Sequence, residues 1–416
     1  MFSAPALLPF LVVALGLGLV PAQQPQVRPP EDPQAPVAPS SLRLALEARD
    51  GSLRSLTAKE LDFPSLAAAG AIALRIEAGP ALPPPGDPAA RAFLGLHGGD
   101  RLVAAVRGGD GDRLDVELAG SVAVPLDVLD LVSLVFPARG DAAGFEAPAS
   151  GDRLYWVRPT GFDKLDGTLE GFAADGIEFE SVLGRRTYPW AEVAALYVEP
   201  LGAPKPAAGE DGAACVDLAD GGRLHARVEK LGPDGVTLAL DKRRKLVLPL
   251  AALRELTLDD GSVRFLSTLV PSEVREGYFD ADGEALGLDW PFQADRAVTG
   301  GPLAAGGRLW ARGLGVHAPS KLTFALDGSW KSLRGAVAID DSVHLLAYKG
   351  SVEFALHLDG KAEPAWRSGR VRGGDAPIAL PALALEGVKQ LELVLSMDER
   401  SFVADRADWL RMLLVR

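Results

Sequence analysis

The stretch GGRLWARGLGVHAPSKLTFALDG, residues 306–328, decides how the last third of the chain folds. In its second half Leu322, Phe324 and Leu326 alternate with other residues, which is the two-residue period of a half-buried β-strand. In its first half Gly313 and Gly315 closely precede His317, and glycines permit backbone angles or close approaches that a Cβ atom would forbid. We therefore expect a tight, shaped loop that leads into a core strand.

The same alternation returns three times after this stretch. It is found in SVEFALHLDG (351–360), in QLELVLSMD (390–398) and in DWLRMLLVR (408–416). Short alternating strands that are bounded by Gly, Asp and Pro, without a convincing helix, are typical of a β-sandwich. We predict an all-β chain whose residues 271–416 form a sandwich.

Several blocks of this region carry a resemblance to a known family. They are Trp290 followed by RAVTGGPLAAGGRLWARGLGVHAPSKLTFALDG (296–328), AVAIDD (336–341), GSVEFALHLDGK (350–361), WRSGRVRGGD (366–375) and DRADW (405–409). Taken in this order, they resemble the NPCBM family of carbohydrate-binding modules over roughly residues 276–416. The resemblance implies a galactose-binding-like jelly-roll sandwich that binds sugars and performs no catalysis.

Three segments before the sandwich look like copies of one unit. They span residues 96–136, 159–198 and 218–258, and each combines short strands, an Asp-Gly turn, a proline and a final strand. A unit of this size with four or five short strands is most economically closed as a small SH3-like or Sm-like β-barrel. We therefore predict three barrel repeats, which lie in segments 42–138 (with an N-terminal β module), 150–201 and 213–262.

The N-terminal sequence indicates export. An apolar run followed by small residues is typical of a secretory signal, and we expect it to occupy residues 1–22, followed by a Pro-rich linker over residues 23–41. We expect no integral membrane domain after cleavage and a secreted, periplasmic or cell-envelope location. The net charge of −13 makes nucleic acid an improbable partner, because phosphates would be repelled.

No catalytic constellation is found in the sequence. The 5 histidines show no zinc-binding spacing, the single cysteine cannot complete a metal cluster, and no nucleophile elbow or P-loop is present. We therefore predict that the protein is not an enzyme and that it has no certain cofactor.

Four residues of the C-terminal region are candidates for sugar contacts. His317 can hydrogen-bond a sugar hydroxyl or brace the loop that does, although a satisfied histidine over the core is the alternative. Trp366 lies in a polar loop, where an indole face can stack on a sugar ring. Asp340 and Asp341 can accept sugar hydroxyls or coordinate calcium, or they can cap a turn.

A second acidic pair lies close to the C-terminus. Asp405 and Asp408 flank Arg406 just before the last strand. They can hold a structural calcium ion or contact sugar, and the alternative is an ion-pair and turn network that fixes the strand.

The sequence as a whole predicts an exported, non-catalytic carbohydrate-binding protein whose partner is a glycan or polysaccharide. A cell-envelope assembly protein that docks onto other envelope proteins is a second interpretation. An accessory subunit of a glycoside hydrolase is a third.

Overall fold

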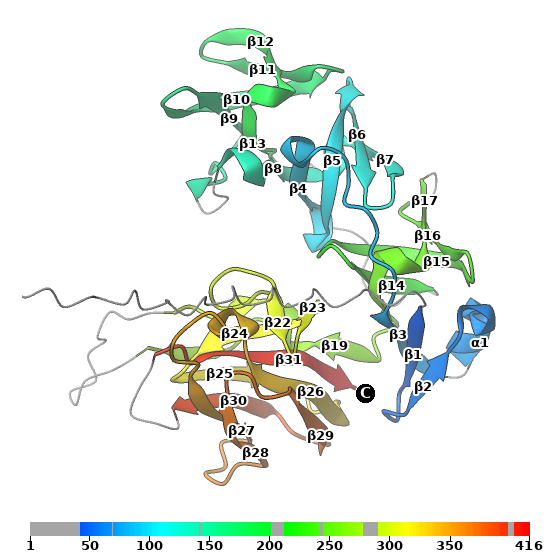
Figure 1. The fold of residues 1–416 in the computed structure, drawn as a ribbon, viewed down its shortest axis with the longest axis vertical. Coiled ribbons are helices and arrows are strands. Elements are labelled where there is room, and N and C mark those ends of the chain that lie inside the picture. The colour runs from blue at the N-terminus through cyan, green and yellow to red at the C-terminus, as the bar shows by residue number, and fades with distance from the viewer. Residues whose placement is uncertain are drawn as a thin grey trace, which may run out of the picture. The chain divides into compact units, whose positions relative to one another are not determined.

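A computed structural model describes residues 42–68, 70–140, 144–200, 212–241, 244–277, 290–397 and 403–416. Figure 1 shows strands throughout the described chain, with only short helices, so the all-β prediction is confirmed. None of the helices in these ranges is long and apolar enough to cross a membrane. The signal peptide predicted for residues 1–22 and the linker predicted for residues 23–41 lie outside the described residues.

The C-terminal region is built from two antiparallel sheets. The first sheet, called the β31 sheet below, has the order β21-β24-β31-β26-β29, and β19 also pairs with β31. Its strands are β19 (Val263–Phe265), β21 (Gln293–Ala294), β24 (Gly313–His317), β26 (Ser332–Ile339), β29 (Ile378–Ala384) and β31 (Arg406–Val415). Because β19 belongs to this sheet, the sandwich includes residues ahead of the predicted start at residue 271.

The second sheet, called the β25 sheet below, has the order β20-β25-β30-β27-β28. Its strands are β20 (Glu273–Glu276), β25 (Ser320–Ala325), β27 (Ser351–Leu358), β28 (Trp366–Arg372) and β30 (Gln390–Met397). Buried side chains from both sheets form one core, in which the rings of Phe354 and Trp409 meet edge to face at 4.9 Å. A separate hairpin joins β22 (Leu303–Ala305) to β23 (Arg308–Trp310).

The stretch at residues 306–328 supplies one strand to each sheet. Its second half forms β25, as the alternation predicts, whereas its glycine-containing first half forms the buried strand β24 instead of the expected loop. The chain turns between the two sheets at Ala318 and Pro319. A Cβ atom on Gly315 would lie 2.3 Å from the carbonyl oxygen of Arg296, so the glycine is needed for a close approach of two backbones.

Each of the three predicted repeats is a meander of five antiparallel strands. The first contains β4 (Arg91–Leu96), β5 (Arg101–Asp110), β6 (Arg113–Leu118), β7 (Val122–Asp127) and β8 (Leu131–Val135). The second contains β9 (Asp152–Arg158), β10 (Gly161–Phe172), β11 (Gly176–Ser181), β12 (Gly184–Pro189) and β13 (Val193–Tyr197). The third contains β14 (Ala213–Leu218), β15 (Arg223–Gly232), β16 (Gly235–Ala239), β17 (Lys245–Leu248) and β18 (Leu253–Leu258).

The first strand of each meander pairs with the last, so that β4 meets β8, β9 meets β13 and β14 meets β18. A single 3-10 turn precedes each last strand: η4 (Val128–Asp130), η7 (Trp190–Glu192) and η8 (Leu250–Ala252). This closure is the pairing expected of a small barrel. The SH3-like or Sm-like assignment of the repeats stays a prediction.

Strands of different segments also pair. β8 of the first meander pairs with β13 of the second, and β18 of the third pairs with β3 of the N-terminal segment. Short 3-10 turns are also found elsewhere in the described chain: η1 (Ala58–Glu60), η2 (Pro88–Ala90), η3 (His97–Gly99), η5 (Pro137–Arg139), η9 (Leu266–Thr268) and η10 (Asp341–Val343).

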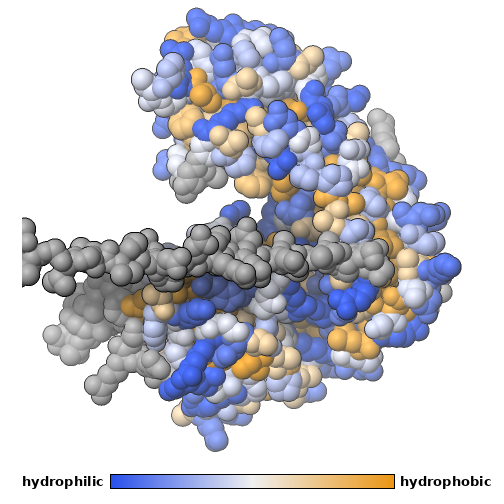
Figure 2. All heavy atoms as spheres, viewed as in Figure 1, coloured by the Kyte–Doolittle hydropathy of each residue, from blue (hydrophilic) through white to orange (hydrophobic). Residues whose placement is uncertain are grey.

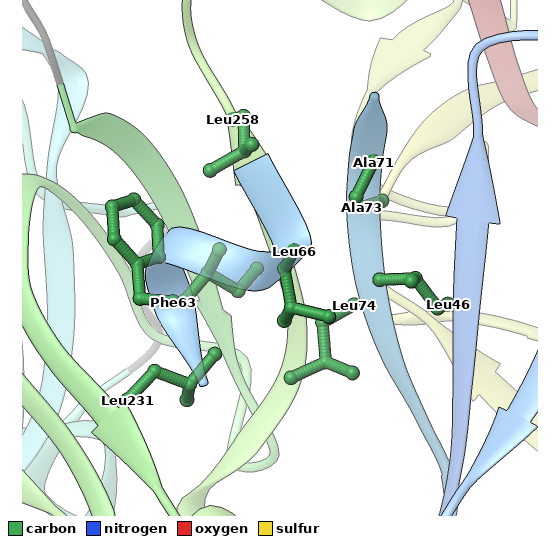
Figure 3. Close-up of a pocket in the computed structure, with 9 residues that line it drawn as sticks. Leu46, Phe63, Leu66, Ala71, Ala73, Leu74, Leu231 and Leu258 are labelled. Atoms are coloured by element: carbon green, nitrogen blue, oxygen red, sulfur yellow. The ribbon is translucent and has the colours of Figure 1, made fainter. Parts of the chain in front are cut away.

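The N-terminal segment contains β1 (Arg43–Ala48), β2 (Leu53–Leu56), α1 (Phe63–Ala68) and β3 (Ala71–Ala78). Phe63 and Leu66 of α1 line a small apolar cavity together with Leu74 and Leu231, as Figure 3 shows. The short helix therefore packs its apolar side chains onto neighbouring strands. At the surface, hydrophobic residues lie among hydrophilic ones on the face shown in Figure 2.

Candidate carbohydrate-binding site

One end of the β31 sheet gathers most of the predicted site residues. His317, the last residue of β24, is the register partner of Arg406, the first residue of β31. Ile339, the last residue of β26, is the partner of Ala407, so Asp340 follows at the same end. We call this end, with Trp290 and residues 317, 340, 341, 405 and 406, the rim. Strand register alone brings together positions that are far apart in sequence.

An aromatic pair lies at the rim. The rings of Trp290 and His317 stack with centroids 5.2 Å apart and planes inclined by 16°. Trp290 is 37% exposed, whereas His317 is only 7% exposed, so the indole is the accessible member of the pair. The guanidinium carbon of Arg406 lies 5.8 Å from the Trp290 ring centroid. An exposed indole face backed by a second ring can receive the C–H face of a sugar.

His317 is held as a neutral ring. Its Nδ1 lies 2.9 Å from the carbonyl oxygen of Ala318, and a carbonyl only accepts, so Nδ1 carries the hydrogen. Burial lowers the pKa of His317, the hydrogen bond to Ala318 opposes that effect, and the positive charge of Arg406 lowers the pKa further. The Nε2 atom of such a ring is an acceptor, which suits a sugar hydroxyl.

Asp340 and Asp341 hold the hairpin of β22 and β23. Asp340 accepts hydrogen bonds from the backbone N–H of Ala304 at 3.1 Å and of Ser342 at 2.9 Å. Asp341 accepts from Gly306 at 3.2 Å and from Gly307 at 2.8 Å. Their carboxylates therefore serve as loop anchors, which is the turn-capping role that the sequence left open. Their predicted contacts with sugar or calcium stay a prediction.

The second acidic pair is buried beneath the rim. Asp408 is fully buried, and neither of its carboxyl oxygens has a hydrogen-bond partner among the described residues. Burial, and next the charge of Asp340, raise the pKa of Asp408 well above its ordinary value, which favours the protonated acid. Asp405 accepts from the backbone N–H of Ser351 at 2.9 Å. Within the described ranges no cluster of three or more acidic, histidine or cysteine side chains could hold a metal ion, and calcium at Asp405 and Asp408 remains untested.

Trp366 does not join the rim. It begins β28 in the β25 sheet, opposite Leu356, while the rim end of that strand is Arg372, which pairs with Ser351. β28 has 7 residues, and a strand advances about 3.3 Å per residue, so about 20 Å of strand separates its two ends. The ring of Trp366 also packs partly against the core.

Trp290 is the rim residue that the sequence analysis did not name as a candidate for sugar contact. Its position beside Pro291, just before the short strand β21, was the available signal. That signal says nothing about the partner of the indole, because His317 lies on a different strand. The structure thus places Trp290 beside the ring of His317, whereas Trp366 lies elsewhere.

One curated protein is similar to part of the chain. Over 120 residues the chain is 36% identical to "Alpha-1,3-galactosidase B" of Akkermansia muciniphila, which covers 28% of this chain and 14% of that enzyme. The chain thus spans about a seventh of the length of this curated relative.

Two solved structures are also similar to the chain. The CBM51 module of Clostridium perfringens GH95, solved in complex with methyl-galactose, is 21% identical, with a TM-score of 0.31 over 37% of this chain and 99% of the module. The tandem CBM51 modules of Sp3GH98, a family 98 glycoside hydrolase from Streptococcus pneumoniae SP3-BS71, are 14% identical, with a TM-score of 0.30 over 89% of this chain and 88% of theirs. The family model of the NPCBM/NEW2 domain matches residues 265–415, which confirms that the sandwich of this chain resembles that family.

Proposed function

We propose that the protein is an exported, non-catalytic carbohydrate-binding protein that recognises sugar at the rim of its C-terminal sandwich. The observation that carries the proposal is the half-exposed indole of Trp290, stacked on the neutral ring of His317. The match of residues 265–415 to the NPCBM/NEW2 domain supports a role in carbohydrate binding. The apolar run at residues 1–22 supports export.

The chemistry of the rim fits a neutral sugar. The indole offers an apolar face, the acceptor nitrogen of His317 suits a hydroxyl, and the guanidinium of Arg406 can donate to ring or hydroxyl oxygens. Few atoms of one sugar would be desolvated on so open a surface, so each contact is weak and binding to a polymer would be strengthened by repetition.

The test is a glycan array with the full chain, run with and without calcium, followed by calorimetry on the best ligand. Trp290→Ala should weaken binding about tenfold, because loss of one stacked ring costs about 1.4 kcal/mol. His317→Ala should weaken it by a similar factor. Loss of binding when calcium is removed would support the calcium site predicted at Asp405 and Asp408.

Trp366→Ala is the matched control, because that indole is distant from the rim and should leave affinity unchanged while circular dichroism shows an intact fold. The proposal would be wrong if no glycan binds, or if Trp366→Ala abolishes binding while Trp290→Ala preserves it.

Protein docking is the second candidate function, and one observation favours it. Leu345 is 97% exposed and Leu346 is 36% exposed, on the loop that follows η10 beside the rim. Envelope proteins would be the partners, and the chain could equally act as the accessory subunit of a glycoside hydrolase. A Leu345→Ser variant that keeps glycan affinity but no longer captures an envelope protein would favour docking.

A further inference from the structure

A small pocket that shares no residue with the rim has five arginines among its 11 lining residues. It has a volume of about 80 Å³, and its side chains come from β3, β18, β31 and the hairpin of β22 and β23. Its guanidinium groups belong to Arg75, Arg254, Arg308, Arg312 and Arg411, and we call it the arginine pocket. Glu77 and Glu255 also line the pocket, so its five arginines leave the lining side chains with a net positive charge in a chain whose net charge is −13.

Two of the five arginines are already neutralised. Arg411 lies 2.6 Å from a carboxylate oxygen of Glu255 and 2.8 Å from one of Glu47. Arg312 lies 3.0 Å from Asp217. These side chains are all buried, so their charges are balanced within the protein.

The other three arginines are not held in buried ion pairs of this kind. Arg254 donates to two carbonyl oxygens, of Leu309 at 2.7 Å and of Ala219 at 2.9 Å. The guanidinium carbon of Arg308 lies 3.8 Å from the centroid of the Trp310 ring. Across the described part of the chain, neither these two nor Arg75 forms a salt bridge.

The positive charge in the pocket is costly for the protein alone. Burial lowers the pKa of Arg254, and burial followed by the neighbouring charge of Arg75 lowers the pKa of Arg308. The exposed carboxylate of Glu77 partly opposes the shift at Arg308. The carboxylates of Asp217 and Asp220 partly oppose the shift at Arg254. A bound anion would relieve the repulsion, and guanidinium groups bind planar or tetrahedral oxyanions with two parallel hydrogen bonds.

We propose that Arg75, Arg254 and Arg308 bind an oxyanion, either a free sulfate or phosphate ion or the acidic group of a charged sugar. The small volume fits one charged group and excludes a whole oligosaccharide. The guanidinium group of Arg308 rests on the ring of Trp310. This ring is itself fixed, because its indole N–H donates to the carbonyl oxygen of Ala305 at 3.2 Å. The site shares no residue with the rim.

The test titrates the full chain with sodium sulfate, sodium phosphate, sodium glucuronate and galactose, at constant ionic strength set with sodium chloride. Calorimetry and thermal melting should show saturable binding and a higher Tm with at least one oxyanion, and neither with galactose. Tighter binding of glucuronate identifies an acidic sugar as the ligand, and tighter binding of sulfate or phosphate identifies the free ion. Both results support the proposal.

Variants locate the site. Arg308→Gln, on an exposed residue, should weaken oxyanion binding at least fivefold, and Arg254→Gln should do the same. Arg367→Gln is the matched control, because Arg367 is an exposed arginine of β28 that pairs with Glu353 and does not line the pocket. Absence of saturable oxyanion binding, or equal weakening by the control and the pocket variants, would overturn the proposal.

Discussion

Two histidines show how the surroundings of a residue set its charge. His317 is buried beside a cation and is held neutral, whereas His225 is held positive. The Nδ1 atom of His225 lies 2.6 Å from a carboxylate oxygen of Asp100, which is completely buried. This hydrogen bond, and next a hydrogen bond to Cys215, raise the pKa of His225 to about 10.

The pH dependence of stability should report this charge. The folded-state pKa of His225, about 10, lies above its ordinary value of 6.5, so the stabilisation is complete below pH 6.5 and is lost as the pH rises towards 10. Replacing His225 with Gln removes this contribution. We therefore expect that the native chain has a larger free energy of unfolding than the variant at pH 6.5. This difference, measured by urea unfolding at pH 6.5, 8 and 9.5, should become smaller as the pH rises. A difference in free energy of unfolding that does not change with pH would contradict a positively charged His225.

At the residue scale the sequence indicated candidate polar side chains, and their role in binding stays a prediction. His317, Asp340, Asp341 and Asp405 do meet at one end of one sheet, as their positions at strand ends suggest. Their contacts depend on strand register, which a periodic pattern does not specify. Strand register places Trp366 at the end of β28 opposite to the rim, and its predicted contact with sugar stays a prediction.

At the scale of elements, the glycines of β24 were correctly expected to permit close approach, although the expected loop is a strand. Gly315 passes the backbone of residues 296–298 so closely that a Cβ atom would lie 2.5 Å from the amide nitrogen of Val298. Buried β24 therefore tolerates no side chain at this position. Alternation and turn residues sufficed to predict β25, β27, β30 and β31, since period and burial agree there.

Gly315→Ala should destabilise the protein by about 1–3 kcal/mol, the usual cost of overpacking a closed site. Chemical unfolding of the full chain measures the change. Gly232→Ala is the control, because a Cβ atom there meets nothing within 4 Å, and its effect should be small. Equal stability of the two variants would show that the backbone at residues 296–298 can move aside.

At the scale of the whole described chain, buried ion pairs join distant segments. Asp217 of β14 accepts from Arg223 at 2.6 Å and from Arg312 at 3.0 Å, and Arg312 lies beyond β23. Asp217 is 1% exposed, so its charge depends entirely on these two partners. No local pattern predicts such a contact, because Asp217 and Arg312 are 95 residues apart.

Asp217→Asn should therefore cost about 3–5 kcal/mol, since it leaves two buried guanidinium groups with Asp295 as the one carboxylate that they still share. Glu353→Gln, which breaks the exposed pair with Arg367, should cost less than about 1 kcal/mol. Urea unfolding monitored by tryptophan fluorescence compares the two variants. Similar losses in both would mean that the buried pairs contribute no more than surface pairs do.

The pairing of β8 with β13, and of β18 with β3, has a consequence for the chain in solution. A strand with unsatisfied amide and carbonyl groups is a template for pairing with another molecule. In this chain β8 and β18 each pair with a strand from another segment of the same polypeptide, so these edges are not free. Proteolysis or truncation between the meanders would expose the edges of strands such as β8 and β13, whose backbone amide and carbonyl groups would then be unpaired. The fragments should therefore self-associate into oligomers even though each retains its own core.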